Sequence, residues 1–430
     1  MLLKNENASI RLDFVSYEFP ETEYGMDEYD KNWLQLRCTW VDEDGKRRYY
    51  DGATVREATL HAVGDAQGNI GTGALVAFAD QLSGYNLLTG SYSPLGQGND
   101  LYLTLDARYN YIAYQALNGR KGAVGVYNYK TGEILCMVSA PSFDPANPPD
   151  IQDGDERYDG VYLNRFLSGT FTPGSVYKTV TLAAAIENVP DLYDRTWTCT
   201  GSTTVGDGTV TCPYAHGEQD IYAALSNSCN GVFALLADEL GEDVLARYTE
   251  KAGLTASYSV NGIRTAAGSF DLDGLTANEL GWAGVGQYND LVNPCALMVY
   301  MGAIGGGGRA AVPELILKTE NALGLPSLPS FTSHTGTLIA SDTTEALADM
   351  MGRNVTDQYG SSRFPNMDLC AKSGTAEVGG GKSPHAWFAG FLRNEDAPYA
   401  FVVLVENGGS GADVAGSVAA QVLDAVVNGY

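Results

Sequence analysis

Apolar and polar residues alternate twice near the start of the chain, which is the pattern of half-buried β-strands. Ile10, Leu12 and Phe14 carry the first run, and residues 33–38 carry the second. An acidic segment, ETEYGMDEYD, separates the two runs. The pattern predicts a small β-rich segment within residues 1–52.

Longer helices and strands are expected further along the chain. Apolar residues at helical spacing follow Asp106, which is a suitable N-cap residue. Two β-prone runs over residues 122–139 are joined at Lys130–Gly132, which predicts a hairpin. Another helix is expected to start at TPGSVYK, with Thr172 as its cap and Pro173 in the first turn.

Three β-prone segments stand close together near the C-terminus. They are residues 368–378, 385–393 and 399–407, and an amphipathic helix is expected after them over residues 415–427. Helical patterns, one of which begins near Asn230, lie between the early hairpin and these strands. We therefore predict an α+β fold in which helices flank an antiparallel sheet built from the early hairpin and the three late strands.

The charge balance excludes one large class of partners. The chain has 430 residues with 26 Lys+Arg and 52 Asp+Glu, a formal net charge of −26. Nucleic-acid-binding proteins neutralise phosphates with clustered cations, whereas the densest basic run here, Lys46–Arg48, is surrounded by acidic residues. We expect no nucleic-acid partner. No run of 18 apolar residues and no signal peptide is visible in the sequence.

Seven cysteines are too few for a disulfide-built scaffold in a chain of this length. Cys199 and Cys212 bracket a Gly/Thr-rich stretch that predicts a hairpin, and they would pair across it in an exported protein. Three interpretations stay open: a disulfide, free thiols or a metal site. For a zinc site His216 would supply a third ligand, but the spacing indicates no fourth.

Three short motifs occur in one order along the chain. They are Ser175–Lys178 (S-x-x-K), Ser228–Asn230 (S-x-N) and Lys372–Thr375 (K-S-G-T). Each is weak alone, because Ser259–Asn261 also fits S-x-N and Lys130–Gly132 also fits K-T-G. The second S-x-N lacks a helix start behind it, and the K-T-G precedes the S-x-x-K. Order and context therefore favour one catalytic site made by the first three motifs.

The S-x-x-K spacing suits a serine nucleophile with a lysine base. Residues i and i+3 of a helix share one face, so Lys178 is expected beside Ser175. A serine hydroxyl is a poor nucleophile until a base removes its proton, and a lysine can do this only when it is neutral. Burial and a nearby cation such as Lys372 lower a lysine pKa, which makes Lys178 the expected general base.

The other two motifs supply polar groups for the reaction. Ser228 would relay a proton between Lys178 and a leaving amine, and Asn230 would hydrogen-bond a peptide substrate, although both residue types are also common N-caps. On a predicted strand, Gly374 would allow a close approach, and the Thr375 N–H would complete an oxyanion hole with that of Ser175. We assign catalysis to Ser175, Lys178, Ser228 and Asn230, substrate binding to Lys372, Ser373, Gly374 and Thr375, and no metal ligand to this site.

These motifs and several longer segments resemble the transpeptidase domain of penicillin-binding proteins. The segments include GAVGVYNYKTGEILCMVSAPSFDP, YLNRFLSGTFTPGSVYKTVTLAAAIE and GVGQYNDLVNPCALMVYMGAIGGGG, and the resemblance extends over about residues 53–430. It is strongest to the monofunctional class B type, because no glycosyltransferase domain is visible. It implies a penicillin-binding, β-lactamase-like fold with a transpeptidase domain over residues 101–430 and a linker or head region over residues 53–100.

The resemblance also implies an activity. A serine D,D-transpeptidase of this family cross-links peptidoglycan stem peptides, with Ser175 forming an acyl-enzyme and an amine from a neighbouring stem peptide resolving it. β-Lactams would inhibit the enzyme by acylating Ser175. The resemblance implies no metal or organic cofactor. It implies partner proteins of cell-wall synthesis and a location at the extracytoplasmic face of a bacterial membrane, although no anchor is visible.

Two features depart from this family. Residues 1–40 do not look like its N-terminus, and YEFP, the acidic segment and NWL resemble small immunity proteins of the WapI type. The role of this N-terminal segment is therefore open. Ser373 stands where threonine is commoner in the third motif, but it keeps the hydroxyl group.

Rival functions use the same motifs. A D,D-carboxypeptidase or a β-lactamase would pass the acyl group to water, and Glu187 and Glu279 are by position the candidate bases for a β-lactamase. A non-catalytic β-lactam sensor would be acylated without turnover. The lifetime of a penicillin label and the formation of cross-linked product distinguish these alternatives.

Overall fold

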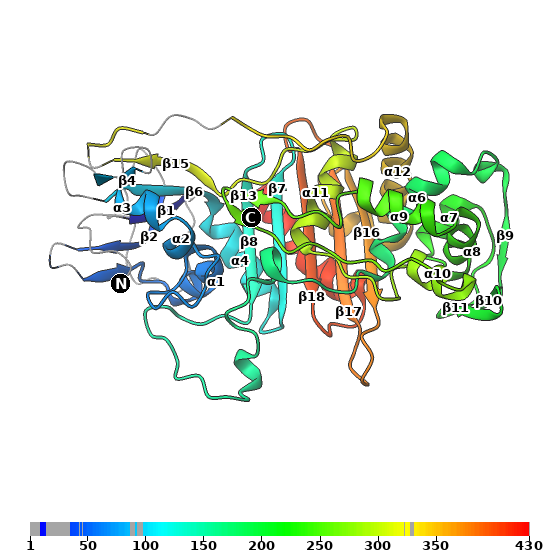
Figure 1. The fold of residues 1–430 in the computed structure, drawn as a ribbon, viewed down its shortest axis with the longest axis horizontal. Coiled ribbons are helices and arrows are strands. Elements are labelled where there is room, and N and C mark those ends of the chain that lie inside the picture. The colour runs from blue at the N-terminus through cyan, green and yellow to red at the C-terminus, as the bar shows by residue number, and fades with distance from the viewer. Residues whose placement is uncertain are drawn as a thin grey trace.

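The computed structural model describes residues 9–13, 35–42, 44, 46–86, 91–92, 98–321, 323–326 and 331–429. The molecule is elongated in Figure 1, with a five-stranded sheet across its middle, N-terminal strands at one end and a group of helices at the other. Phe14, the acidic segment and the first part of the second alternating run lie outside the described residues, so those expectations stay predictions.

The central sheet joins strands from both ends of the catalytic region. Its order is β16-β17-β18-β7-β8, and all neighbouring strands are antiparallel. The predicted union of the early hairpin with three late strands is therefore confirmed, with β16 at one edge. The strands are β7 (Gly122–Asn128), β8 (Ile134–Ala140), β16 (Leu369–Ala376), β17 (His385–Leu392) and β18 (Tyr399–Val405).

Helices cover both faces of this sheet, as its alternating side chains require. In β18, Val402 and Leu404 join the apolar cluster that contains α11 (Pro294–Gly305). Phe401, Val403 and Val405 join the cluster on the opposite face, which contains residues of α4 (Ala107–Leu117) and α13 (Gly416–Asn428). The predicted cap of α4 is confirmed, because the Asp106 carboxylate accepts from the N–H groups of Arg108 and Tyr109.

A helical region lies beyond the β16 edge of the sheet (Figure 1). One of its helices, α6, follows a single 3-10 turn, Gly174–Val176, that carries the serine of the S-x-x-K motif. The expected cap by Thr172 is wrong: no side chain caps this turn, and the Thr172 carbonyl accepts from the Trp387 indole N–H at 2.9 Å. The helices are α6 (Lys178–Asn188), α7 (Ile221–Ser226), α8 (Asn230–Leu240), α9 (Glu242–Lys251), α10 (Ala277–Gly284) and α12 (Ser341–Asn354).

Three N-terminal strands join β6 and β15 in a second five-stranded sheet, which confirms the β-rich N-terminal region. Its order is β15-β6-β1-β2-β3, and β1 pairs in parallel with β6 and antiparallel with β2. This sheet contains residues from each side of the predicted boundaries at 52/53 and 100/101, and the boundaries themselves stay predictions. The strands are β1 (Ser9–Asp13), β2 (Gln35–Val41), β3 (Arg47–Tyr49), β6 (Asp100–Asp106) and β15 (Ile316–Glu320).

Shorter elements complete the described chain. The Gly/Thr-rich stretch between two cysteines forms the predicted hairpin, β10 with β11. Within the described residues no helix is both long and apolar enough to span a membrane. The remaining elements are α1 (Ala53–Val63), α2 (Ala74–Ala77), α3 (Ala79–Ser83), β4 (Tyr85–Asn86), β5 (Ser91–Tyr92), α5 (Arg165–Ser168), β9 (Trp197–Cys199), β10 (Ser202–Val205), β11 (Gly208–Thr211), β12 (Gly217–Gln219), β13 (Ser259–Val260) and β14 (Ile263–Arg264).

Candidate active site

The three motifs come together from separate parts of the chain. Ser175 stands in the 3-10 turn before α6, and Lys178 is the first residue of α6. Ser228 lies in the turn between α7 and α8, and Asn230 begins α8. The third motif lies on β16, the edge strand that faces this region. The structure thus places the predicted residues of all three motifs at one site.

Lys178 contacts the serines and the asparagine of the first two motifs. Its side chain is fully buried, and its Nζ lies 3.0 Å from Ser175 Oγ. The same Nζ is 2.6 Å from the Ser228 carbonyl oxygen and 2.7 Å from Asn230 Oδ1. The amide of Asn230 is oriented by its other end, because Nδ2 donates to the Thr211 carbonyl at 2.8 Å. Two carbonyl-type oxygens and the hydroxyl groups of Ser175 and Ser228 therefore surround the lysine nitrogen.

This arrangement suits a neutral lysine. Burial lowers the pKa of Lys178 to about 7, while the nearby sulfur groups of Cys229 and Cys212 act in the opposite direction. A neutral amine has two N–H groups and one lone pair, whereas an ammonium group has three N–H groups. The two carbonyl-type oxygens occupy both N–H groups, which leaves the lone pair to accept the proton of Ser175. Lys178 is therefore placed as a general base.

A second buried lysine, Lys372, contacts the serine of the S-x-N motif, Ser228. Lys372 Nζ donates to Ser228 Oγ at 3.0 Å and to the Ser373 carbonyl at 2.8 Å. Ser228 Oγ is also 3.2 Å from Lys178 Nζ, so it lies between the two amines. Burial, and then repulsion by Lys178, lower the pKa of Lys372 well below its usual value. This repulsion lowers the pKa of Lys372, whereas the pKa of Lys178 is lowered by its own burial; the expected effect of Lys372 on Lys178 stays a prediction.

The backbone at Ser228 is held in an unusual conformation. Its φ is +52°, in the left-handed region that non-glycine residues rarely enter. The Ser228 N–H donates to the Leu225 carbonyl, and the Cys229 N–H reaches back to Ala224, which is the capping pattern that usually has glycine at this position. A serine accepts this strain here because its hydroxyl is placed between two lysines, and such strain is typical of functional sites.

Two glycines let the edge strand approach the serine turn. A Cβ atom on Gly374 would stand 2.9 Å from the Pro173 carbonyl oxygen and 3.1 Å from Val176 Cγ1. Gly174 has a φ of +56°, and a Cβ there would stand 2.7 Å from the Thr375 carbonyl oxygen. The expected close approach at Gly374 is therefore between β16 and the backbone of the serine turn.

The two hydroxyl residues of the third motif have different environments. Ser373 is tied to Tyr359, whose hydroxyl donates to Ser373 Oγ at 3.1 Å and accepts from its N–H at 2.8 Å. Thr375 is exposed, and its Oγ1 accepts from the Gly411 N–H at 3.3 Å. Thr375 is the more accessible group for an incoming carboxylate. Its role in binding and in an oxyanion hole stays a prediction.

Sequence reasoning missed three residues that support the site. Thr211 holds the amide of Asn230, and Tyr359 holds Ser373. Gln287 Nε2 donates to the Thr375 carbonyl at 3.0 Å, which fixes the end of the motif strand. Gln287 lies in a family-like segment, GVGQYND, which was a usable signal; nothing in the sequence around the other two indicated their contacts.

The two misleading motif copies have structural roles. Lys130–Gly132 forms the turn between β7 and β8, where the Gly132 N–H donates to the Asn128 carbonyl. Asn261 Oδ1 accepts from the N–H groups of Leu315 and Ile316, at 2.5 and 3.0 Å. The distinction drawn from order and context is therefore consistent with the structure.

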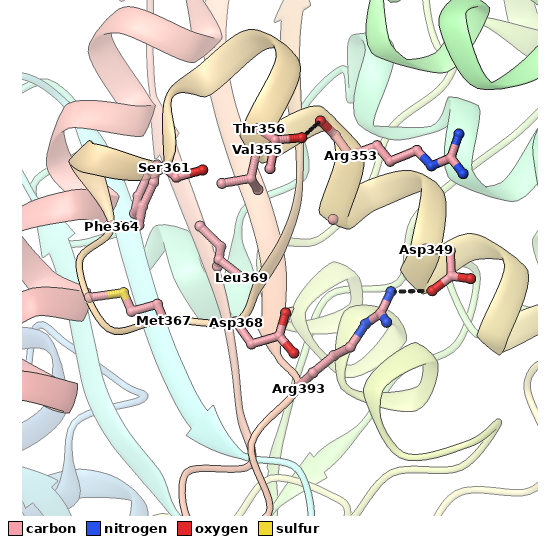
Figure 2. Close-up of a pocket in the computed structure, with 11 residues that line it drawn as sticks. Asp349, Arg353, Val355, Thr356, Ser361, Phe364, Met367, Asp368, Leu369 and Arg393 are labelled. Atoms are coloured by element: carbon pink, nitrogen blue, oxygen red, sulfur yellow. Dashed lines mark hydrogen bonds and ion pairs between the residues drawn. The ribbon is translucent and has the colours of Figure 1, made fainter.

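A separate pocket lies between α12 and β16. Figure 2 shows that the guanidinium of Arg393 and the carboxylate of Asp349 meet across it, at 2.8 Å, with Asp368 and Arg353 also at its wall. None of the three motifs lines this pocket. It is therefore distinct from the serine site.

A buried lysine base, a serine within reach of it and a second hydroxyl between two amines define a serine acyl-transfer enzyme. The family model described as the penicillin binding protein transpeptidase domain matches residues 122–427. The chain belongs to this family. The predicted class, a serine-type transpeptidase of the penicillin-binding type, is therefore confirmed. A second model, the immunity protein WapI-like family, matches residues 1–63.

Named relatives and solved structures agree with this family. The peptidoglycan D,D-transpeptidase PbpA of Mycolicibacterium smegmatis is 28% identical over 343 residues, which cover 73% of this chain and 68% of the relative. Stage V sporulation protein D of Bacillus subtilis is 32% identical over 252 residues, or 51% of this chain and 37% of that protein.

The fold is also found in solved structures. The D,D-transpeptidase domain of a peptidoglycan glycosyltransferase from Eggerthella lenta has a TM-score of 0.80, 25% identity and 99% coverage of both chains. Penicillin-binding protein A of Mycobacterium tuberculosis, as its ceftriaxone acyl-enzyme complex, has a TM-score of 0.82, 21% identity and 99% coverage of both chains. The predicted fold class is confirmed.

Proposed function

We propose that this chain is a peptidoglycan D,D-transpeptidase that joins stem peptides through an acyl-enzyme on Ser175. The observation that carries the proposal is the fully buried Lys178, whose Nζ lies 3.0 Å from Ser175 Oγ while two other oxygens occupy its N–H groups. The names of the relatives, among them the mycobacterial D,D-transpeptidase, support the same reaction.

In the first half-reaction Lys178 takes the proton of Ser175 as its oxygen attacks the peptide carbonyl before a terminal D-alanine. The leaving D-alanine needs a proton, and Ser228 Oγ, 3.2 Å from Lys178 and 3.0 Å from Lys372, can pass one to it. Lys372 and exposed Thr375 stand where the terminal carboxylate binds. Burial and Lys178 disfavour the charged form of Lys372, and a bound carboxylate would favour it, which supplies a local positive charge in a chain with a net charge of −26.

In the second half-reaction an amine from a neighbouring stem peptide attacks the ester carbon of the acyl-enzyme. Lys178, neutral again, removes the proton of that amine, and the proton then returns to Ser175 as the ester bond breaks. The same residues serve both halves, because each half transfers one acyl group and one proton. β-Lactams enter the first half only, and the acyl-enzyme complex of the mycobacterial fold neighbour supports this inhibition.

We also propose a location and a class of partner. Stem peptides are cross-linked outside the cytoplasmic membrane, so we place the enzyme at the extracytoplasmic face of a bacterial membrane. A fold neighbour with a TM-score of 0.64 comes from a study of polymerisation and cross-linking by a peptidoglycan synthase complex. This neighbour supports a partner protein of cell-wall synthesis that polymerises glycan. We expect no nucleic-acid partner.

The direct test supplies the purified chain with a pentapeptide stem donor and a D-amino acid acceptor. Mass spectrometry should show the exchanged product, with release of D-alanine. Hydrolysed tetrapeptide as the sole product would instead establish a D,D-carboxypeptidase. An acyl-enzyme with penicillin but no turnover of the stem peptide would support the sensor alternative.

The rate of penicillin acylation should depend on pH through Lys178. Below pH 7 the lysine binds a proton and cannot accept one from Ser175, so the rate should fall about tenfold for each pH unit. Above that value, given the pKa of about 7, the rate should reach a plateau. Stopped-flow labelling between pH 5 and 10 checks this, and a rate that climbs steadily to pH 10 would contradict a neutral base.

The two candidate water-activating carboxylates should not affect loss of the penicillin label. Glu187 lies nine residues along α6 from Lys178, about 13 Å away by helical rise, and accepts from Tyr248 and Thr343. Glu279 closes the capping box of α10 with Thr276. Their glutamine variants should keep the label as long as the parent enzyme does.

The control for this experiment is a β-lactamase assayed in parallel, which loses the label within seconds. A half-life of seconds in the parent chain would favour the hydrolase. A half-life that lengthens strongly in either glutamine variant would identify that glutamate as the missing base.

A further inference from the structure

Four side chains that commonly bind metals gather beside the S-x-N motif. The ligand atoms of Cys199, Cys212, His216 and Cys229 all lie within 4.8 Å of one another. Cys229 is the middle residue of the S-x-N motif itself, and the sequence spacing did not indicate it as a fourth ligand. All seven cysteines are free thiols in the structure, so the alternative of a Cys199–Cys212 disulfide is not the arrangement observed.

The separations between these atoms distinguish a metal site from a disulfide. A disulfide bond is about 2.0 Å long, whereas the Cys212 and Cys229 sulfur atoms are 3.8 Å apart. A tetrahedral zinc ion with bonds of about 2.3 Å to sulfur and about 2.0 Å to nitrogen sets its ligands roughly 3.5–3.8 Å apart. His216 Nδ1 lies 3.3 Å from the Cys199 sulfur, which is close to the separation of two ligands of one zinc ion.

Each of the four residues stands at the end of a short element. Cys199 ends β9, Cys212 follows β11, His216 precedes β12, and Cys229 precedes α8. Val205 and Val210 of the hairpin form a small apolar cluster with Ala234 of α8. A segment with so little apolar core gains stability from a metal that ties its ends together, as small metal-binding modules do.

The hairpin is in direct contact with the catalytic machinery. Thr211, the residue before Cys212, accepts from Asn230 Nδ2 at 2.8 Å, and Asn230 Oδ1 accepts from Lys178 at 2.7 Å. The Asn230 backbone N–H also faces the Cys212 sulfur. A displacement of the hairpin therefore moves the amide that orients the base.

We propose that Cys199, Cys212, His216 and Cys229 bind one zinc ion, which fixes the β9–β12 segment against the start of α8 and thereby positions Ser228 and Asn230. Four protein ligands leave no open coordination position, so the metal has a structural role and takes no part in acyl transfer. The proposal that zinc binds here does not depend on the proposed transpeptidase activity. The proposed role of zinc in positioning Ser228 and Asn230 does rest on that activity.

Metal content is the first test. The full chain, produced with zinc in the medium and purified under reducing conditions, should contain about one zinc per chain by elemental mass spectrometry. After removal of the metal and addition of Co²⁺, the chain should show the intense visible bands of tetrahedral, thiolate-bound cobalt. A parent chain with neither zinc nor these bands would overturn the proposal.

Variants then test the ligands. Cys212→Ser and His216→Ala should lose most of the zinc, and a matched control, Cys38→Ser in the N-terminal sheet, should keep it. If a variant fails to fold, the parent chain still tests the metal site. A chelator should lower the melting temperature of the parent chain, and added zinc should restore that temperature. Full zinc content in both ligand variants would overturn the assignment.

Acylation tests the positioning role separately. The folded His216→Ala chain should be labelled by fluorescent penicillin more slowly than the Cys38→Ser control, with a plateau of the same height at long times. A chain that loses zinc without any change in acylation rate would overturn the positioning role alone. A parent chain that binds zinc but never reacts with penicillin would contradict the proposed function and leave the metal site standing.

Discussion

Ser175→Ala should abolish covalent labelling by penicillin. The variant lacks the oxygen that forms the ester, and Lys178, although still a base, has no hydroxyl within 3.0 Å to deprotonate. Removal of a nucleophile that acts with its base lowers turnover by about a millionfold in a well-studied serine hydrolase. Intact-mass analysis after exposure to a β-lactam should show the adduct on the parent chain and none on the variant.

The matched control for this variant is Ser259→Ala. Ser259 begins the misleading S-x-N copy on β13, is exposed and lies in a different hairpin, so its removal should leave labelling unchanged. Peptide mapping of the parent adduct should identify the peptide that contains Ser175. A label that persists in Ser175→Ala would show that another residue is the nucleophile.

Lys178→Ala should slow acylation by about 10²–10⁴-fold, which is the usual contribution of general-base catalysis to the rate. The alanine also removes the partner of the Ser228 carbonyl and of Asn230 Oδ1, which then face a buried space. Part of the loss could therefore come from a displaced second motif. The second-order rate constant for a fluorescent penicillin measures the total effect.

Two comparisons separate these causes. Lys178→Arg keeps a cation but not a neutral base, so it should remain slow even if the fold is retained. Lys130→Ala, in the turn of the misleading K-T-G copy, should react at the parent rate. An alanine variant at position 178 that labels within threefold of the parent would rule out Lys178 as the base.

The catalytic residues were predictable because the reaction demands particular groups at particular spacings. A helix start places Ser175 and Lys178 on one face, and this relation is local in sequence. The meeting of Ser228 with Lys372 is not local, because it depends on how an edge strand packs against a helix turn. The order of the motifs and the family resemblance indicated a shared site, but not this contact. The contacts of Tyr359 and Thr211 depend on the same packing and were not predicted.

Other features could not be read from local patterns. The alternating run at Ile10 predicts a strand but not its partner, and β1 in fact pairs in parallel with β6, about 90 residues away. The cap at Thr172 failed because the tertiary contact of its carbonyl with Trp387 sets that turn. The approach of Cys229 to Cys199, Cys212 and His216 also depends on tertiary packing and not on local spacing.

The strand order of the central sheet makes the active site depend on strands that are far apart in the sequence. β7 and β8 are neighbours in sequence, but the next strand in the sheet is β18, so Gly122 pairs with Val405, which lies far along the chain. β16, which carries Lys372, joins the sheet only through β17. Long-range pairing of this kind is slow and comes late in folding. A chain that stops before β16 lacks one of the two lysines at Ser228, so the penicillin label should mark chains in which β16 is present and paired with β17.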